Sequence, residues 1–275
     1  MLCWQFGYSV PFTLRNKHDT MPTNHFTKVS VLIPAYNEEK YILRTLNALI
    51  AQDYPSFEII IADNASTDQT LLVINRFLER VTSTIRIIIV QESKQGTNHA
   101  RECARKMATG AIIAQIDADC IPSSNWLSKG VSALLRSKRV AVTGPYDYYD
   151  GDHVMRFFSL YSQMLLYPLI NKFVQLAKRG AILIGGNAFI RAEVLEMAGG
   201  YNTCLTFYGD DVDMGKRLSV YGPIVFVNSL VQLSSSRRYK ANGFWQVNKK
   251  YQSFFWNLIW QNEHLLQTAE TNHPR

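Results

Sequence analysis

Short apolar runs alternate with amphipathic stretches along the first half of the chain. Four continuous runs rich in β-branched residues predict buried strands at 29–34, 57–63, 85–90 and 111–117. Three stretches between them repeat apolar residues at helical spacing, at 38–52, 66–81 and 96–110. Ser66 or Thr67 is expected to cap the second helix. This alternation predicts an α/β fold, with a mostly parallel sheet covered by helices on both faces.

The second half is less regular. A strand or hairpin arm is expected at 139–149, and a long aromatic helix over 153–180 that is interrupted at Pro168. The remaining elements are a strand, glycine turn and helix at 181–201, a helix at 208–222 and a strand at 223–228. We find no linker, so we expect one domain over 28–240, a loosely ordered extension at 1–27 and a basic, aromatic helical tail at 241–275.

Composition narrows the class of protein only slightly. Of 275 residues, 47% are hydrophobic and 19% charged, which is typical of a globular domain, and the net charge of +7 favours anionic partners. The four cysteines show no CxxC spacing, so we expect neither a zinc site nor a disulfide framework, and a reducing, cytoplasmic compartment fits best. No apolar run reaches the roughly 18 residues that a membrane span needs.

Polar clusters follow three of the predicted strands, at Pro34–Asn37, Asp63–Ser66 and Asp117–Asp119. The carboxyl ends of parallel strands meet at one edge of a sheet, where ligands bind. Asp117 and Asp119 are two apart, so in an extended segment both carboxylates project to the same face. A divalent cation would offset their repulsion. The alternative is a strand that runs into a solvated turn.

Four segments in order resemble the family-2 inverting glycosyltransferases of the GT-A fold: "VSVLIPAYNEE", "IIIADNASTDQT", "IDADC" and "YGDDVDMGKRL". The resemblance runs from about Val29 to Arg238. It implies a nucleotide-binding half at 28–120, an acceptor and sugar half at 121–240, and transfer of a sugar from a nucleotide-sugar to a hydroxyl. It also implies Mn²⁺ or Mg²⁺, with Asp119 as metal ligand and Asp117 at the ribose or the metal's water shell.

The same resemblance implies a set of nucleotide contacts, with UDP as the expected carrier. Tyr36 offers a ring face to the base, and Asp63 can accept a hydrogen bond from a uracil or guanine N–H. Packing of Tyr36, helix capping by Asp63 and a solvated charge at Arg101 are the structural alternatives. The expected nucleotide-binding residues are Pro34, Ala35, Tyr36, Glu38, Asp63, Asn64, Gly96, Arg101 and Asp117.

An acidic cluster at the start of the 208–222 helix matches the position of the family's general base. The family's Glu-Asp pair corresponds here to Asp210 and Asp211, and Asp213 follows two residues later. We rank Asp211 first, Asp210 second and Asp213 third. The alternative is an acidic helix start that the helix dipole favours.

Two further segments match family elements beside the sugar and the diphosphate. Gly186 and Asn187 are expected at the donor sugar, and Arg237 and Arg238 at the diphosphate, with a solvated basic face as the alternative for the arginines. No Gln-x-x-Arg-Trp motif is present, so we expect transfer of a single sugar.

Other functions fit the sequence less well. A sugar nucleotidyltransferase would carry a glycine-rich loop after the first strand, and "PAYNEEKY" has no glycine. A catalytically silent relative that binds a nucleotide-sugar or a partner would not need all of its acids, and no nucleic-acid motif is recognisable. Aromatic and basic residues in 153–178 and in the tail suit either a membrane interface, and then a lipid-linked acceptor, or packing on the acceptor half.

Overall fold

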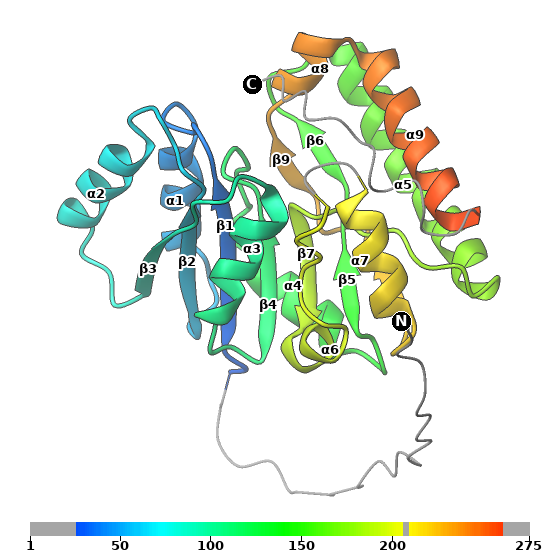
Figure 1. Ribbon diagram of the computed structural model, residues 1–275, viewed down its shortest axis with the longest axis horizontal. Coiled ribbons are helices and arrows are strands. Elements are labelled where there is room, and N and C mark those ends of the chain that lie inside the picture. The colour runs from blue at the N-terminus through cyan, green and yellow to red at the C-terminus, as the bar shows by residue number, and fades with distance from the viewer. Residues whose placement is uncertain (1–25, 206–208, 261–275) are drawn as a thin grey trace, which may run out of the picture.

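A mostly parallel sheet organises the chain in its computed structural model, which describes residues 26–205 and 209–260. Within these ranges seven strands pair in the order β3 (Arg86–Gln91), β2 (Phe57–Asp63), β1 (Val29–Ala35), β4 (Ile112–Ile116), β7 (Asn187–Arg191), β5 (Ala141–Thr143) and β8 (Ile224–Phe226) (Figure 1). β7 runs antiparallel to both neighbours, and the other pairs are parallel. The predicted α/β class and the central parallel strands are therefore confirmed.

Helices cover both faces of this sheet. α1 (Ile42–Ile50), α2 (Thr70–Arg80) and α4 (Trp126–Leu135) enclose one core, which includes Val31 and Ile33 of β1. α3 (Thr97–Lys106), α6 (Ala192–Met197) and α7 (Asp210–Ser219) enclose the other, which includes Leu32. In Figure 1, α3 stands in front of the sheet and α4 behind it. Successive strand residues thus serve opposite cores, as the continuous apolar runs require.

A smaller layer extends beyond the carboxyl ends of the strands. It contains a parallel pair, β6 (Tyr146–Tyr148) with β9 (Gln232–Ser234), and three helices: α5 (His153–Leu176), α8 (Arg237–Asn242) and α9 (Phe244–Trp260). α5 and α9 lie along one side of the molecule (Figure 1). None of the described helices combines the length and apolar character that crossing a bilayer requires.

One expectation about local structure holds in part, and two are wrong. The 139–149 segment contains strands, as expected, but it is no hairpin arm, because Gly144 and Pro145 separate β5 in the main sheet from β6 in the small one. Neither Ser66 nor Thr67 caps α2; its N-cap is Gln69, and Asp68 accepts a hydrogen bond from the Thr70 N–H at 2.9 Å. The glycine pair of the 181–201 segment precedes its strand, β7, instead of following one.

The long helix α5 also continues through Pro168, where an interruption was expected. Proline has no N–H to donate to the carbonyl four residues earlier, which leaves that carbonyl without its helical partner. Here the Met164 carbonyl accepts a hydrogen bond from the Asn228 side chain at 2.9 Å. This outside donor explains how the helix tolerates the proline. The extension predicted at 1–27 and the end of the tail lie largely outside the described residues.

Candidate active site

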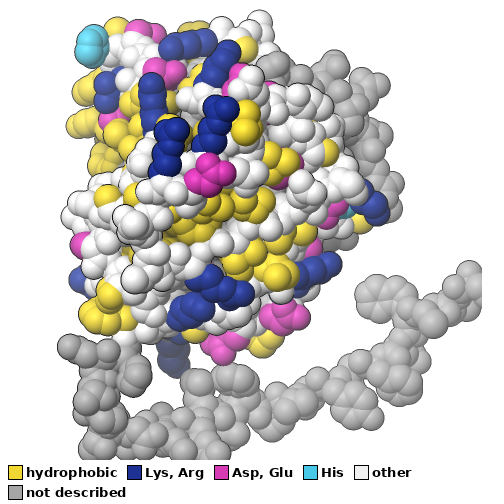
Figure 2. Space-filling model, turned by 90° about the vertical axis from the view of Figure 1, so that its left-hand side faces the viewer, with side chains coloured by type: hydrophobic (Ala, Val, Ile, Leu, Met, Phe, Trp, Pro, Cys, Tyr) yellow, Lys and Arg dark blue, Asp and Glu magenta, His cyan; other side chains and the backbone are white. Residues whose placement is uncertain are grey.

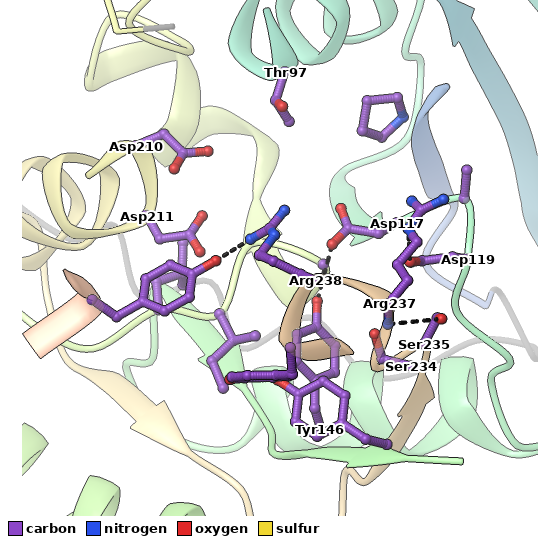
Figure 3. A pocket seen from close by; sticks show the side chains of 18 of the residues that line it. Thr97, Asp117, Asp119, Tyr146, Asp210, Asp211, Ser234, Ser235, Arg237 and Arg238 are labelled. Atoms are coloured by element: carbon purple, nitrogen blue, oxygen red, sulfur yellow. Dashed lines mark hydrogen bonds and ion pairs between the residues drawn. The ribbon is translucent and has the colours of Figure 1, made fainter. Parts of the chain in front are cut away.

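A cavity of about 300 Å³ opens beyond the carboxyl ends of β1 and β4. Its walls come from both halves of the chain and include residues of α3, α5, α7, α8 and α9; Figure 3 shows part of the lining. Most of the sequence-predicted site residues line it: Pro34, Ala35, Tyr36, Glu38, Asn64, Gly96, Arg101, Asp117, Asp119, Gly186, Asp210, Asp211, Arg237 and Arg238. The sheet edge predicted from the polar clusters is thus the floor of a ligand-sized pocket.

Asp117 and Asp119 project into this cavity from the end of β4, on the opposite side from Asp210 and Asp211 in Figure 3. Asp117 accepts from the Arg101 guanidinium at 3.1 Å and from the Tyr146 hydroxyl at 3.2 Å. Asp119 pairs with the Arg237 Nε at 3.1 Å. Burial raises the pKa of Asp119 to about 7, because Arg237 compensates only part of the desolvation and Glu38 and Asp117 repel it.

This carboxylate pair fits a hard divalent cation. Oxygen atoms of Asp117 and Asp119 lie with the Cys120 sulfur within 4.8 Å of one another. Burial raises the pKa of the Cys120 thiol well above its usual value, so the thiol stays protonated and is a poor ligand. The two carboxylates are hard oxygen donors in a partly desolvated setting that favours an added positive charge. The residues present therefore fit Mn²⁺ or Mg²⁺ held by the two aspartates.

The buried Arg101 side chain forms ion pairs with members of both acid pairs, Asp117–Asp119 and Asp210–Asp211. This side chain is only 5% exposed, and its guanidinium lies 3.1 Å from Asp117, 3.1 Å from Asp210 and 3.7 Å from Asp211. These carboxylates outweigh the cost of burial and raise the pKa of Arg101 further above its usual value. Arg101 thus fixes α3, the end of β4 and the start of α7 relative to one another, and it is not the solvated charge that was the alternative.

The three aspartates in the first turn of α7 lie in two different environments. The Asp211 Oδ2 accepts a hydrogen bond from the Gly185 N–H at 3.0 Å, and burial together with Asp210 raises the pKa of Asp211 to about 7. Burial also raises the pKa of Asp210, against the opposing charge of Arg101. Asp213 forms an ion pair with Arg217 at 2.8 Å and does not line the cavity. The geometry therefore leaves Asp211 and Asp210 facing the cavity.

Two arginines close the cavity from the start of α8. The Arg237 guanidinium binds Glu38 (2.7 Å from Nη1 to Oε2) as well as Asp119, and it lies over the Tyr41 ring at 4.8 Å. Arg238 lines the same cavity and contacts the Tyr251 hydroxyl on α9 (Figure 3). These contacts place two positive charges beside the Asp117–Asp119 pair, as a diphosphate site needs.

Hydrogen bonds to the backbone position Asn64 and Gly96, two of the predicted nucleotide-binding residues. Asn64 donates to the carbonyls of Glu92 and Lys94, and its Oδ1 accepts from the Gly96 N–H at 2.7 Å. Gly96 has a φ of 142°, a conformation that side-chain-bearing residues rarely adopt. Asn64 thus shapes the loop that leads into α3, and this loop forms one rim of the cavity.

Two predicted site residues do not line the cavity. Asp63 is 2% exposed, and its Oδ1 has no hydrogen-bond partner within the described part of the chain. Asn187 is fully buried; it accepts from the Trp126 Nε1 at 2.9 Å and donates to the Leu230 carbonyl at 2.7 Å. The Asn187 side chain therefore supports the second half internally, while its neighbour Gly186 reaches the cavity.

Sequence reasoning also missed several cavity residues. Tyr146 reaches Asp117 because β6 pairs with β9, a contact that local sequence does not reveal. A Cβ at Gly186 would collide with both Tyr146 and Asp117, which explains the glycine there. For the tail, the sequence left open a membrane interface or packing on the acceptor half, and it did not indicate that Tyr251 and Phe255 of α9 line the cavity. Their aromatic character was noted from the sequence, but their place in the fold was not.

The family model for glycosyl transferase family 2 matches residues 30–198, well over half of the chain. The chain belongs to glycosyl transferase family 2. It is 30% identical over 214 residues to glycosyltransferase AglE of Haloferax volcanii, an alignment that covers 76% of this chain and 67% of AglE. It is 35% identical over 94 residues to the Staphylococcus aureus poly(ribitol-phosphate) β-N-acetylglucosaminyltransferase TarS, covering 34% of this chain and only 16% of TarS.

Solved structures of other glycosyltransferases share the GT-A fold predicted from the sequence. The mannosyltransferase PcManGT of Pyrobaculum calidifontis, determined with GDP-Man and Mn²⁺, superposes with a TM-score of 0.66 at 25% identity, over 91% of this chain and 69% of that one. TarS residues 1–349 with UDP superpose with a TM-score of 0.59 at 21% identity, over 76% of this chain and 60% of that one. The family and fold predictions are thus confirmed.

Proposed function

We propose that this chain transfers one sugar from a nucleoside-diphosphate sugar to an acceptor hydroxyl, with inversion at the anomeric carbon. The observation that carries this proposal is the pair of acidic sites on opposite sides of one cavity, Asp117 with Asp119 and Asp210 with Asp211. An inverting displacement needs a positive charge at the leaving group and a base on the far face of the sugar. The cavity offers a site for each.

The Asp117–Asp119 side is the proposed diphosphate site. These two carboxylates would hold Mn²⁺ or Mg²⁺, whose positive charge would offset the negative charge that develops on the departing diphosphate. Arg237 and Arg238 lie beside this pair and add hydrogen-bond donors for phosphate oxygens. Tyr36, Asn64 and the loop residues Gln95 and Gly96 before α3 form the adjoining rim, where we place the base and ribose.

Asp211 is the proposed general base. As the acceptor oxygen bonds to the anomeric carbon, the bond from that carbon to the diphosphate oxygen breaks, and the acceptor proton passes to the Asp211 carboxylate. The Gly185 N–H fixes one Asp211 oxygen at 3.0 Å. A carboxylate with a pKa raised to about 7 is a stronger base than an ordinary aspartate. Asp210, bound to Arg101 at 3.1 Å, positions the start of α7.

The relatives suggest the donor and the kind of acceptor. TarS was determined with UDP and with UDP-GlcNAc, and PcManGT with GDP-Man. A 29% identical Escherichia coli protein, aligned over 46% of this chain, is a UDP-glucose-dependent glucosyltransferase that acts on a GlcNAc-diphosphoundecaprenol. We propose UDP as the carrier, ahead of GDP or dTDP, and a role in the assembly of a glycan, polysaccharide or glycolipid.

A donor panel tests this proposal. Purified protein is incubated with UDP-, GDP- and dTDP-sugars in Mn²⁺ or Mg²⁺, and release of free nucleotide is followed with and without chelator. We expect release from one UDP-sugar, abolished by chelator, and a product whose anomeric configuration by NMR is opposite to that of the donor. Chelator-resistant release or a product of retained configuration would contradict the mechanism. Binding of nucleotide-sugars without turnover in the presence of varied acceptors would favour a silent binding protein.

A further inference from the structure

Helix α5 carries a continuous apolar stripe on its outer side. Its exposed hydrophobic residues recur at helical spacing and include side chains that are more than half exposed, up to 74% at Leu176. They are Val154, Phe157, Phe158, Tyr161, Leu165, Leu166, Leu169, Phe173 and Leu176. So many neighbouring exposed apolar side chains on one face mark an interaction surface.

Helix α9 extends this stripe with tryptophans. Trp245 is 82% exposed, and Trp256 and Trp260 are also exposed. Counted at 100° a residue, these three indoles lie on one side of the helix. The Arg179 guanidinium, just beyond the end of α5, lies 5.4 Å from the Trp260 ring centroid, which joins the two helices (Figure 1).

The two helices themselves carry only basic charge. Neither α5 nor α9 contains an aspartate or a glutamate, and Lys172, Lys178, Arg179, Lys249 and Lys250 lie on or next to them and are exposed. Asp152, the N-cap of α5, is an exposed acidic residue at one end of this surface. The far edge of the molecule, at β3 and α2, differs: Figure 2 shows basic, acidic and hydrophobic side chains interspersed there. Apolar and aromatic residues edged by lysine and arginine suit the headgroup region of an anionic bilayer.

The same two helices form a wall of the cavity. Gln163, Tyr167 and Ile170 on the inner side of α5, and Tyr251 and Phe255 of α9, line it. Tyr167, Ile170 and Phe255 make this wall apolar, in contrast to the charged side at Asp117. A bilayer in contact with the outer stripe would therefore lie next to the apolar end of the cavity.

We propose that the outer faces of α5 and α9 bind the surface of an anionic bilayer, with the tryptophans at headgroup level. The nature of the acceptor is a second step, and it rests on the proposed function. We infer that the acceptor is a sugar on a membrane-embedded lipid, and that the apolar part of this lipid leaves the cavity between α5 and α9. The bilayer-binding step itself needs no catalysis and can be tested apart from it.

Vesicle binding tests the surface directly. The full chain is sedimented with vesicles of equal parts phosphatidylglycerol and phosphatidylcholine, and with phosphatidylcholine alone. We expect binding to the anionic vesicles only. Replacing Lys249 and Lys250 by glutamate should weaken binding by at least about 25-fold, because each basic residue near an anionic surface contributes about fivefold. Phe157→Ser with Leu169→Ser should also weaken it. Matched controls on the far side, Leu43→Ser with Leu72→Ser, should bind like the unaltered protein.

Tryptophan fluorescence separates specific insertion from loose adsorption. In a Trp4→Phe background, lipids brominated in their acyl chains should quench the exposed indoles of α9, while the buried Trp126 stays unquenched. Absence of vesicle binding, equal binding by the substituted and control variants, or self-association that buries the stripe without lipid would each overturn the proposal. Vesicle binding as predicted, without turnover of any donor, would reject the proposed function but still support bilayer binding by α5 and α9.

Discussion

Removal of the Arg101 charge should destabilise the fold in a pH-dependent way. Arg101 is 5% exposed and lies 3.1 Å from Asp210, whose side chain is 15% exposed. Loss of one partner from a buried ion pair costs about 3–5 kcal/mol. Asp117 and Asp211 are more than one-third exposed, so solvent screens them and each adds at most about 1 kcal/mol. For Arg101→Met we therefore expect a melting temperature lower by about 10 °C at neutral pH or above.

The pH dependence separates charge from packing. Burial raises the pKa values of Asp210 and Asp211 in the folded protein, so stability falls as pH rises above the ordinary aspartate range, and for Asp211 this fall continues up to its folded pKa of about 7. Without Arg101 these pKa values rise further, and this loss grows. The difference between Arg101→Met and the unaltered protein should therefore be small near pH 4, where these carboxyls are protonated in both folded proteins, and grow as pH rises through about 7 and beyond.

Thermal denaturation by circular dichroism in the presence of a chelator measures this difference across pH. Arg101→Lys, which keeps one charge, serves as the matched control and should recover part of the stability. A difference of the same size at every pH would show that Arg101 contributes by packing alone, and it would refute the proposed role of the guanidinium as the bridge between the acid pairs.

Three further outcomes follow from the cavity. Turnover should rise with pH and level off above about pH 7, because Asp211 must lose its proton before it can accept one, and a pH–rate profile measures this limb. Tyr146→Phe should raise the KM for the donor several-fold with little change in stability, since it removes one hydrogen bond to Asp117; steady-state kinetics and melting curves check both values. Gly186→Ala should abolish donor turnover while the variant stays folded, because its methyl group would meet Tyr146 and Asp117; an active variant would contradict this packing.

The central sheet could be predicted because its signals are local. β2 matches the apolar run at 57–63 residue for residue, and the acids at 117 and 119 follow β4 as expected. The irregular second half could not be read in this way. Tyr146 reaches the cavity only through the pairing of β6 with β9, and α5 passes Pro168 only because Asn228 supplies the missing hydrogen bond. Both depend on contacts between distant segments.

The candidate site shows the same division. Spacing placed Asp117 and Asp119 on one face, and the family resemblance supplied Asp210 and Asp211. The resemblance could not show that the neighbours Gly186 and Asn187 differ in position. Gly186 lines the cavity, whereas the Asn187 side chain lies in the core and accepts a hydrogen bond from Trp126. Nor did the resemblance reveal that Arg101 bridges both acid pairs, because charge partners across the sheet edge leave no mark in the local sequence.

The separate roles of the two acid pairs can be tested most directly by measuring donor binding and donor turnover side by side in single variants. Calorimetry with the UDP-sugar and Mn²⁺ gives binding, and nucleotide release gives turnover. Asp119→Asn should lose metal-dependent donor binding. Asp211→Asn should bind the donor like the unaltered protein and turn it over about 10²–10⁴-fold more slowly. Asp213→Asn should keep both. Full turnover by Asp211→Asn, or unchanged Mn²⁺-dependent binding by Asp119→Asn, would contradict the assignment of base and metal site.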